Sequence, residues 1–161
     1  MISKRFINIL LMFFAFSFIA LSCADKAASL EEPFSVTVYD SDYSMGYAII
    51  YHLDKNNIQV AFSGGLEGET DSVVYKKQLS LLEKEKMAKF FSDFPIADLE
   101  EKYINPNIAD GEKKIFDFRI GKLEKQIQES NYYQEDLAAL VDFINALVSE
   151  EYKMRYEDYQ Y

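Results

Sequence analysis

The sequence predicts an α+β domain, a two-layer sandwich in which a mainly antiparallel sheet carries two helices on one face. Segments with period-two alternation of apolar and polar residues recur between residues 34 and 79 and again between 113 and 130. Two further segments, at about 80–94 and 132–149, repeat their apolar residues at helical spacing. Because no internal repeat or linker interrupts residues 34–161, we expect them to form one domain.

The first half of this domain is predicted to be four strands joined by polar turns. Phe34, Val36 and Val38 show the alternation most clearly, since a smaller or more polar residue follows each of them. The four strand-like segments are 34–39, 43–53, 58–63 and 72–79, and the turns and loop between them are 40–42, 54–57 and 64–71.

The first predicted helix follows these strands. Ser80 and Glu83 have the spacing of a capping box, and Pro95 marks the point where the helix is expected to end. Its apolar stripe is Met87, Phe90, Phe91 and Phe94.

A hairpin of Lys113–Gly121 and Lys122–Ser130 is expected next, because Gly121-Lys122 suits a two-residue turn with glycine first. That turn fixes a register with apolar pairs on one face and an ion pair on the other: Ile120 with Leu123, Phe116 with Ile127, and Arg119 with Glu124.

The second helix is predicted after a capping box of Asn131 and Gln134. Its stripe is Leu137, Leu140, Val141, Ile144, Leu147 and Val148. The stretch after it fits two structures: Tyr152, Met154 and Tyr156 alternate as in a strand, whereas Val148, Tyr152, Tyr156 and Tyr159 have helical spacing.

The first 22 residues have the composition of an export signal. Lys4 and Arg5 precede an apolar run that is shorter than a typical membrane-spanning helix. The residues Ala20-Leu21-Ser22 then come directly before Cys23. This junction resembles a bacterial lipoprotein signal, although the family usually has leucine where this chain has Ala20. The resemblance covers residues 1–23 and implies that Cys23 becomes the first residue of the mature chain and carries lipid.

Two other interpretations of the same segment stay open. Ala20-Leu21-Ser22 also fits ordinary secretory cleavage, which would release a soluble protein with a free thiol, and an uncleaved anchor is the third possibility. We prefer the lipoprotein because the only cysteine of the chain lies at the cleavage junction. Residues 23–33 are then the lipidated cysteine and a polar tether, and the protein is expected in the cell envelope, periplasmic or surface-facing.

Composition and net charge exclude several classes of function. Removal of residues 1–22 leaves 139 residues with 15 basic and 27 acidic side chains, a formal net charge of −12. This charge excludes nucleic-acid binding through a basic face, and one cysteine with one histidine excludes a disulfide scaffold or a four-ligand Cys/His zinc site.

Candidate sites are few, and no catalytic residue or cofactor is predicted. His52 is expected to be an ordinary strand histidine, and oxygen-rich turns offer only weak metal candidates in Asp40, Asp42 and Asp110. Tyrosine gathers near the carboxyl end and is common at interfaces, which suggests a partner-binding patch of Tyr152, Tyr156, Tyr159 and Tyr161.

The sequence therefore favours a lipid-anchored, non-catalytic module that binds another envelope protein through its sheet face or its tyrosine-rich end. Two alternatives remain. The net acidity suits an inhibitor or immunity-type protein against a basic hydrolase or toxin. Carboxylates and tyrosine hydroxyls also suit a small-ligand binder or an enzyme.

Overall fold

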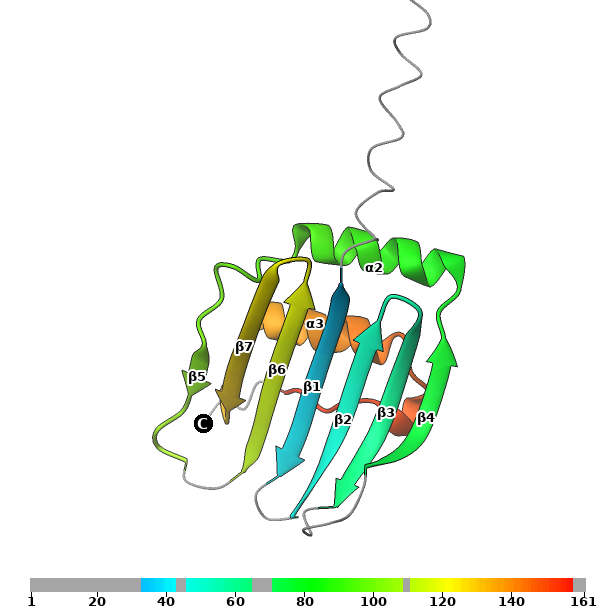
Figure 1. Cartoon of the computed structure of the whole chain (residues 1–161). Helices are drawn as coiled ribbons and strands as arrows, with labels where there is room; N and C mark the ends of the chain where they lie inside the picture. Colours follow the sequence, from blue (N-terminus) through cyan, green and yellow to red (C-terminus); the bar gives the residue numbers. More distant parts are fainter. Residues whose placement is uncertain (1–32, 43–45, 65–70, 109–110, 158–161) are drawn as a thin grey trace, which may run out of the picture. The chain divides into compact units, whose positions relative to one another are not determined.

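A computed structural model describes residues 33–42, 46–64, 71–108 and 111–157, which belong to one compact unit that begins at Pro33. Within these residues the fold is α+β, as predicted (Figure 1). The elements in chain order are β1 (Phe34–Asp42), β2 (Tyr47–Asp54), β3 (Asn57–Gly64), β4 (Ser72–Gln78), α2 (Leu81–Asp93), β5 (Lys102–Ile104), β6 (Glu112–Ile120), β7 (Leu123–Ser130), α3 (Glu135–Asn145) and the short 3₁₀ helix η2 (Glu150–Tyr152).

The seven described strands form one sheet in the order β4-β3-β2-β1-β6-β7-β5. All neighbours are antiparallel except β5 and β7, which are parallel, so the sheet is mixed. The predicted hairpin register is confirmed, with Phe116 opposite Ile127 and Arg119 opposite Glu124. Gly121 opens the turn with a φ of 60°, a left-handed conformation that glycine adopts without steric cost.

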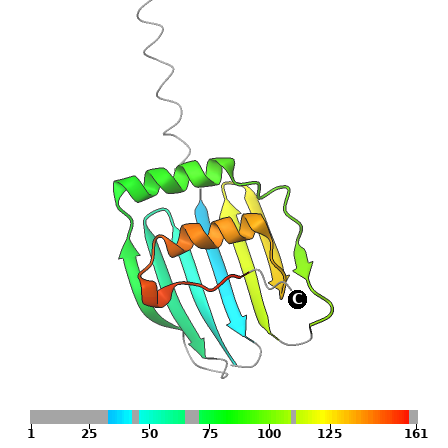
Figure 2. The same ribbon diagram turned by 180° about the vertical axis from the view of Figure 1, so that it is seen from behind.

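The helices lie near the sheet in two different ways. Figure 2 shows α3 crossing one face of the sheet, and α2 lying along the strand ends where β1 begins. Apolar residues of the strands and of both helices join one hydrophobic core, including Val36, Phe116, Met87 and Leu137. Ser80 and Glu83 form the predicted capping box of α2, each side chain accepting from the other residue's backbone N–H.

The carboxyl-terminal segment, residues 146–157, crosses the same face as α3 (Figure 2). Its η2 turn and the extended residues after it replace both the strand and the continued helix that the sequence allowed. Asn145 at the end of α3 fastens this segment, because its amide donates to the Met154 carbonyl at 2.9 Å and accepts from the Met154 N–H at 2.8 Å.

Two expectations need correction, and one strand was missed. The turn predicted at residues 40–42 is the end of β1, where the ladders to β2 and β6 continue through Asp42. The second helix is shorter than the predicted 132–149, since α3 spans Glu135–Asn145. Gln134 caps it, because Asn131 instead takes a left-handed φ of 49° and accepts from the Glu112 N–H. Strand β5 was not predicted, since three residues are too few to show a period.

Among the described residues, no helix combines the length and apolar character that a membrane crossing needs.

Candidate functional site

The most unusual feature of the core is a group of charged side chains, which we call the charge cluster: Asp40, Glu112, Lys114 and Glu129. Lys114 and Glu129 are only 1% and 2% exposed, so each is buried as deeply as a core leucine. Charged side chains are almost never buried to this extent without partners. The cluster therefore needs a physical explanation.

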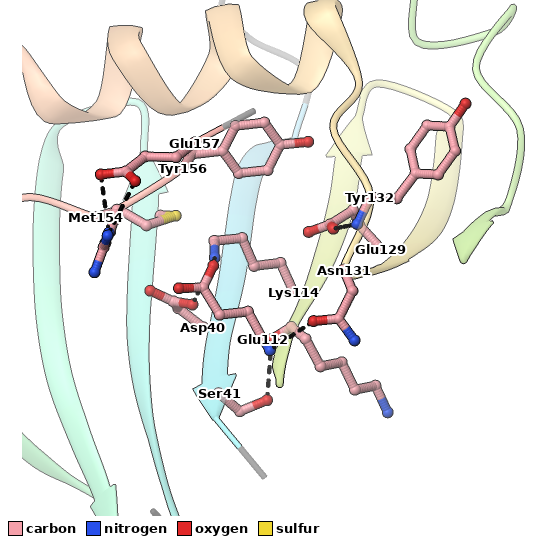
Figure 3. Close-up of polar contacts among 12 residues, drawn as sticks. Asp40, Ser41, Glu112, Lys114, Glu129, Asn131, Tyr132, Met154, Tyr156 and Glu157 are labelled. Carbon is pink, nitrogen blue, oxygen red and sulfur yellow. Dashed lines mark hydrogen bonds and ion pairs between the residues drawn. The ribbon is translucent and has the colours of Figure 1, made fainter. Parts of the chain in front are cut away.

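Strand geometry places these side chains together. Lys114 is opposite Asp40 on β1 and opposite Glu129 on β7, so the three residues form a row across three neighbouring strands. Their side chains point to the same face as Val38 and Phe116, because alternate residues of a strand share a face. Glu112 is two residues before Lys114 on β6 and joins the cluster from the strand end (Figure 3).

Lys114 is the cation of the cluster. Its Nζ lies 3.1 Å from Asp40 Oδ1 and 3.0 Å from Glu112 Oε2. Burial alone would lower the pKa of Lys114, but the two carboxylates outweigh burial, and the net pKa is raised. Lys114 is therefore held as a charged ammonium, which is not a nucleophile.

Glu129 is the group that can change its charge near neutral pH. Burial raises its pKa from 4.5 to about 7, although the Tyr132 N–H bond and the charge of Lys114 oppose the shift and the charges of Glu112 and Asp40 add to it. Tyr132 N–H donates to Glu129 Oε1 at 2.8 Å. The cluster thus gains one negative charge as the pH rises through neutrality.

Tyr156 of the carboxyl-terminal segment covers the cluster. Its ring centroid is 5.6 Å from Lys114 Nζ, within the range of a cation–π contact, and the ring also lies 5.4 Å from that of Tyr133. The Tyr156 hydroxyl accepts from the Gln134 N–H at 3.2 Å, at the start of α3. Burial raises the pKa of Tyr156, so it stays a neutral phenol at physiological pH.

The space left beside the cluster is small. A cavity of about 10 Å³ lies among Glu112, Glu129, Asn131, Tyr132, Tyr156 and Glu157. That is room for roughly one water molecule. The arrangement therefore suits an internal ion-pair network that fixes the carboxyl-terminal segment on the sheet.

The predicted site residues are placed as follows. Asp40 lies in the charge cluster, whereas the Asp42 side chain and Asp110 lie outside the described residues. Within the described residues, no three His, Cys, Asp or Glu side chains are arranged so that they could hold a metal ion. Tyr152 packs against Tyr75 at 5.1 Å between ring centroids, and Tyr156 covers Lys114. Cys23, Tyr159 and Tyr161 also lie outside the described residues.

His52 lies within β2, on the sheet face opposite the core. Its Nδ1 is 2.9 Å from Thr37 Oγ1 on β1, and Thr37 is in turn opposite Asp117 on β6. Asp117 accepts from Gln126 Nε2 at 2.7 Å. These side chains form one polar row across the sheet. The row continues to Gln59 on β3, which is opposite His52.

This second face of the sheet, the outer face, carries an apolar row beside the polar one. The apolar row crosses five neighbouring strands through registered pairs of Tyr39 with Ile50 and Ile115, Ile50 with Ala61, and Ala61 with Val73. Figure 1 shows that neither α2 nor α3 covers this face. Val73 is 57% exposed, and the other four are half-buried by their neighbours in the sheet.

Lys114 and Glu129 were not predicted as site residues, although the sequence contains a signal for them. The hairpin register that pairs Phe116 with Ile127 also pairs Lys114 with Glu129 two residues further along, on the same inward face. No local pattern indicated Asp40, the ion-pair partner of Lys114, because its place beside β6 depends on the pairing of two segments that are distant in the sequence.

The comparisons with known proteins add no family. No protein-family model matches the chain, and no curated protein matches it either.

Proposed function

We propose that this chain is a lipid-anchored protein of the bacterial cell envelope, held to a membrane through Cys23, and that its domain binds another envelope protein without catalysing a reaction. We further propose that the domain is a two-layer sandwich, with the sheet as one layer and the two helices as the other, which leaves the outer face of the sheet for the partner.

The observation that carries the proposal is the apolar row on the outer face. A solvated face of an antiparallel sheet is ordinarily polar, and contiguous apolar side chains there are typical of an interaction site. Tyr39 lies in the middle of the row with Ile50 and Ile115 on either side. An aromatic side chain with aliphatic neighbours and a polar border has the composition of an interface centre.

The charge cluster supports the non-catalytic part of the proposal. Its ammonium is neutralised by two carboxylates, and Tyr156 covers it. A substrate would have to displace the carboxyl-terminal segment to reach it. The alternative of an enzyme that uses carboxylates therefore gains no support from the deepest carboxylates of the described domain.

Photo-crosslinking in living cells tests the proposed surface. Tyr39 is replaced by benzoylphenylalanine, which preserves an aromatic ring in the middle of the apolar row, and a second strain carries the same residue at Tyr159. We expect a protein adduct at position 39 that disappears when Ile115→Glu is added, because a carboxylate there is costly to desolvate in an interface.

Each other outcome has a defined meaning. An adduct at position 159 alone would transfer the binding surface to the tyrosine-rich end. A basic hydrolase or toxin in the adduct would identify the acidic-inhibitor alternative. Recovery of only uncrosslinked monomer from both strains would contradict the proposal.

A further inference from the structure

The end of the domain that carries α2 has three properties that the proposed protein-binding surface does not use. It holds the most exposed large apolar side chains, it is rich in lysine, and it is where the chain enters the domain. We infer that α2 and the two turns beside it, 54–57 and 121–122, form a surface that rests on the headgroups of the membrane to which Cys23 is anchored. This inference depends on the proposed lipid anchor.

Exposed leucines begin this helix. Leu81 is 74% exposed and Leu82 is 60% exposed, more than any other large apolar side chain of the described residues. They follow the capping residue Ser80, whose hydrogen bonds with Glu83 fix the first turn and therefore the direction of both leucines. Two adjacent leucines held outward in this way can enter the boundary between headgroups and acyl chains.

The charge of this end differs from that of the whole chain. The helix and its two turns contain five lysines and four acidic residues, whereas the chain contains 17 basic and 27 acidic residues. Glu83 is already paired with Lys77 at 2.7 Å, and Asp54 caps the backbone N–H groups of Asn56 and Asn57. The five lysines are Lys55, Lys84, Lys86, Lys89 and Lys122, and their charge favours an anionic lipid surface.

The entry point of the chain brings this end close to the anchor. Phe34, the first residue of β1, packs on Phe91 of α2 with 4.9 Å between ring centroids, and the Pro33 carbonyl accepts from the Gly121 N–H at 2.8 Å. Figure 1 shows that β1 begins beside α2. About ten residues separate Pro33 from Cys23, and a chain of that length spans at most ~35 Å. The α2 end is therefore the end of the domain at which the tether to Cys23 begins.

Contacts of α2 with its neighbours hold this surface rigid. Phe90 stacks on Phe143 of α3 with 4.6 Å between centroids, and Lys84 donates to Asn56 of the β2–β3 turn at 2.7 Å. The first contact fixes α2 on α3 and the second fixes it to the neighbouring turn, while Leu82, Lys86 and Lys89 are exposed. The outer face of the sheet would then stand roughly perpendicular to the membrane plane, where a neighbouring anchored protein can reach it.

Depth-dependent fluorescence quenching tests the inference. The mature lipidated protein carries Leu82→Cys labelled with a nitrobenzoxadiazole dye, and a matched control carries Asn107→Cys, an exposed residue outside α2 and its two turns. Both proteins are placed in vesicles of phosphatidylethanolamine and phosphatidylglycerol at 3:1 that contain a doxyl-labelled lipid. We expect at least twofold stronger quenching at position 82 than at position 107, and a smaller difference when Lys86→Glu and Lys89→Glu are added.

The outcomes separate this inference from the proposed function. Peptide mass analysis of the same samples reports the state of Cys23. A lipidated Cys23 with equal or weaker quenching at position 82 overturns the membrane-facing surface and leaves the anchor intact. An unmodified Cys23 overturns the anchor itself.

Discussion

Among single residues, Lys114 stands out as a fully buried ammonium between two carboxylates. Its removal leaves acidic side chains in the core without their cation. We therefore expect Lys114→Met to lower the free energy of unfolding by about 3 kcal/mol, the size typical when one partner of a buried ion pair is deleted. Urea denaturation measures this change.

The matched control is Lys86→Met, at an exposed position of α2. We expect it to change the stability by less than about 0.5 kcal/mol. If Lys114→Met were as mild as Lys86→Met, the charge cluster would not be an essential part of the core.

Glu129 makes stability depend on pH. Its folded pKa of about 7 lies above the ordinary value of 4.5, so the folded state binds the proton more tightly than the unfolded chain. The corresponding stability is fully present below pH 4.5 and is lost as the pH rises through 7, by an amount on the order of 3 kcal/mol.

Glu129→Gln isolates this contribution. The amide stays neutral at every pH, and its oxygen can still accept from the Tyr132 N–H. In urea denaturation, we expect the free energy of unfolding of the parent protein to decline between pH 5 and 8. The part of this decline that Glu129 causes should be absent in the variant. Parallel profiles for the two proteins would show that Glu129 titrates elsewhere.

At the scale of elements, the start of α2 is set by Ser80. Its hydroxyl accepts from the Glu83 N–H and the Glu83 carboxylate accepts from the Ser80 N–H. We expect Ser80→Ala to cost about 1 kcal/mol in thermal or urea unfolding. Ser149 is a natural control, because it precedes η2 without any side-chain capping bond, and Ser149→Ala should leave stability nearly unchanged.

The carboxyl-terminal segment depends on Asn145. Asn145→Ala removes both hydrogen bonds to Met154 and leaves the backbone of that residue without a partner. We expect trypsin to cleave after Lys153 and Arg155 several times faster in this variant, since local opening exposes the segment. Asn107→Ala, at an exposed turn, should retain the parent rate; equal rates in both variants would show that other contacts hold the segment.

Local pattern predicted the elements whose signals lie within a few residues. The Ser80–Glu83 box, the Gly121-Lys122 turn and the pairs it fixes are confirmed, because each depends on backbone chemistry at short range. Asn131 has the same capping-box spacing as Ser80. Its side chain, however, accepts a hydrogen bond from the Glu112 N–H, and Gln134 caps the helix instead. A contact at the open end of the β6–β7 hairpin decided that case.

At the scale of the whole molecule, long-range pairing determined what the sequence could not. The Asp40–Asp42 stretch has turn composition, but its ladders to two strands and the ion pair of Asp40 with Lys114 keep it in β1. Pairing of distant strands also assembled the charge cluster and aligned the apolar row of the outer face. Neither could be derived from a single strand, because a period of two gives each side chain a face but does not name its neighbours.

The proposed lipid anchor connects the two proposed surfaces, since it would hold the α2 end at the membrane and present the outer face to a neighbour. The mass of the mature amino-terminal peptide tests this anchor most directly. We predict a chain that begins at Cys23 and carries a diacylglycerol on sulfur and an acyl group on the amino nitrogen. A mature peptide with an unmodified Cys23 thiol, or a chain that retains residues 1–22, would contradict the account.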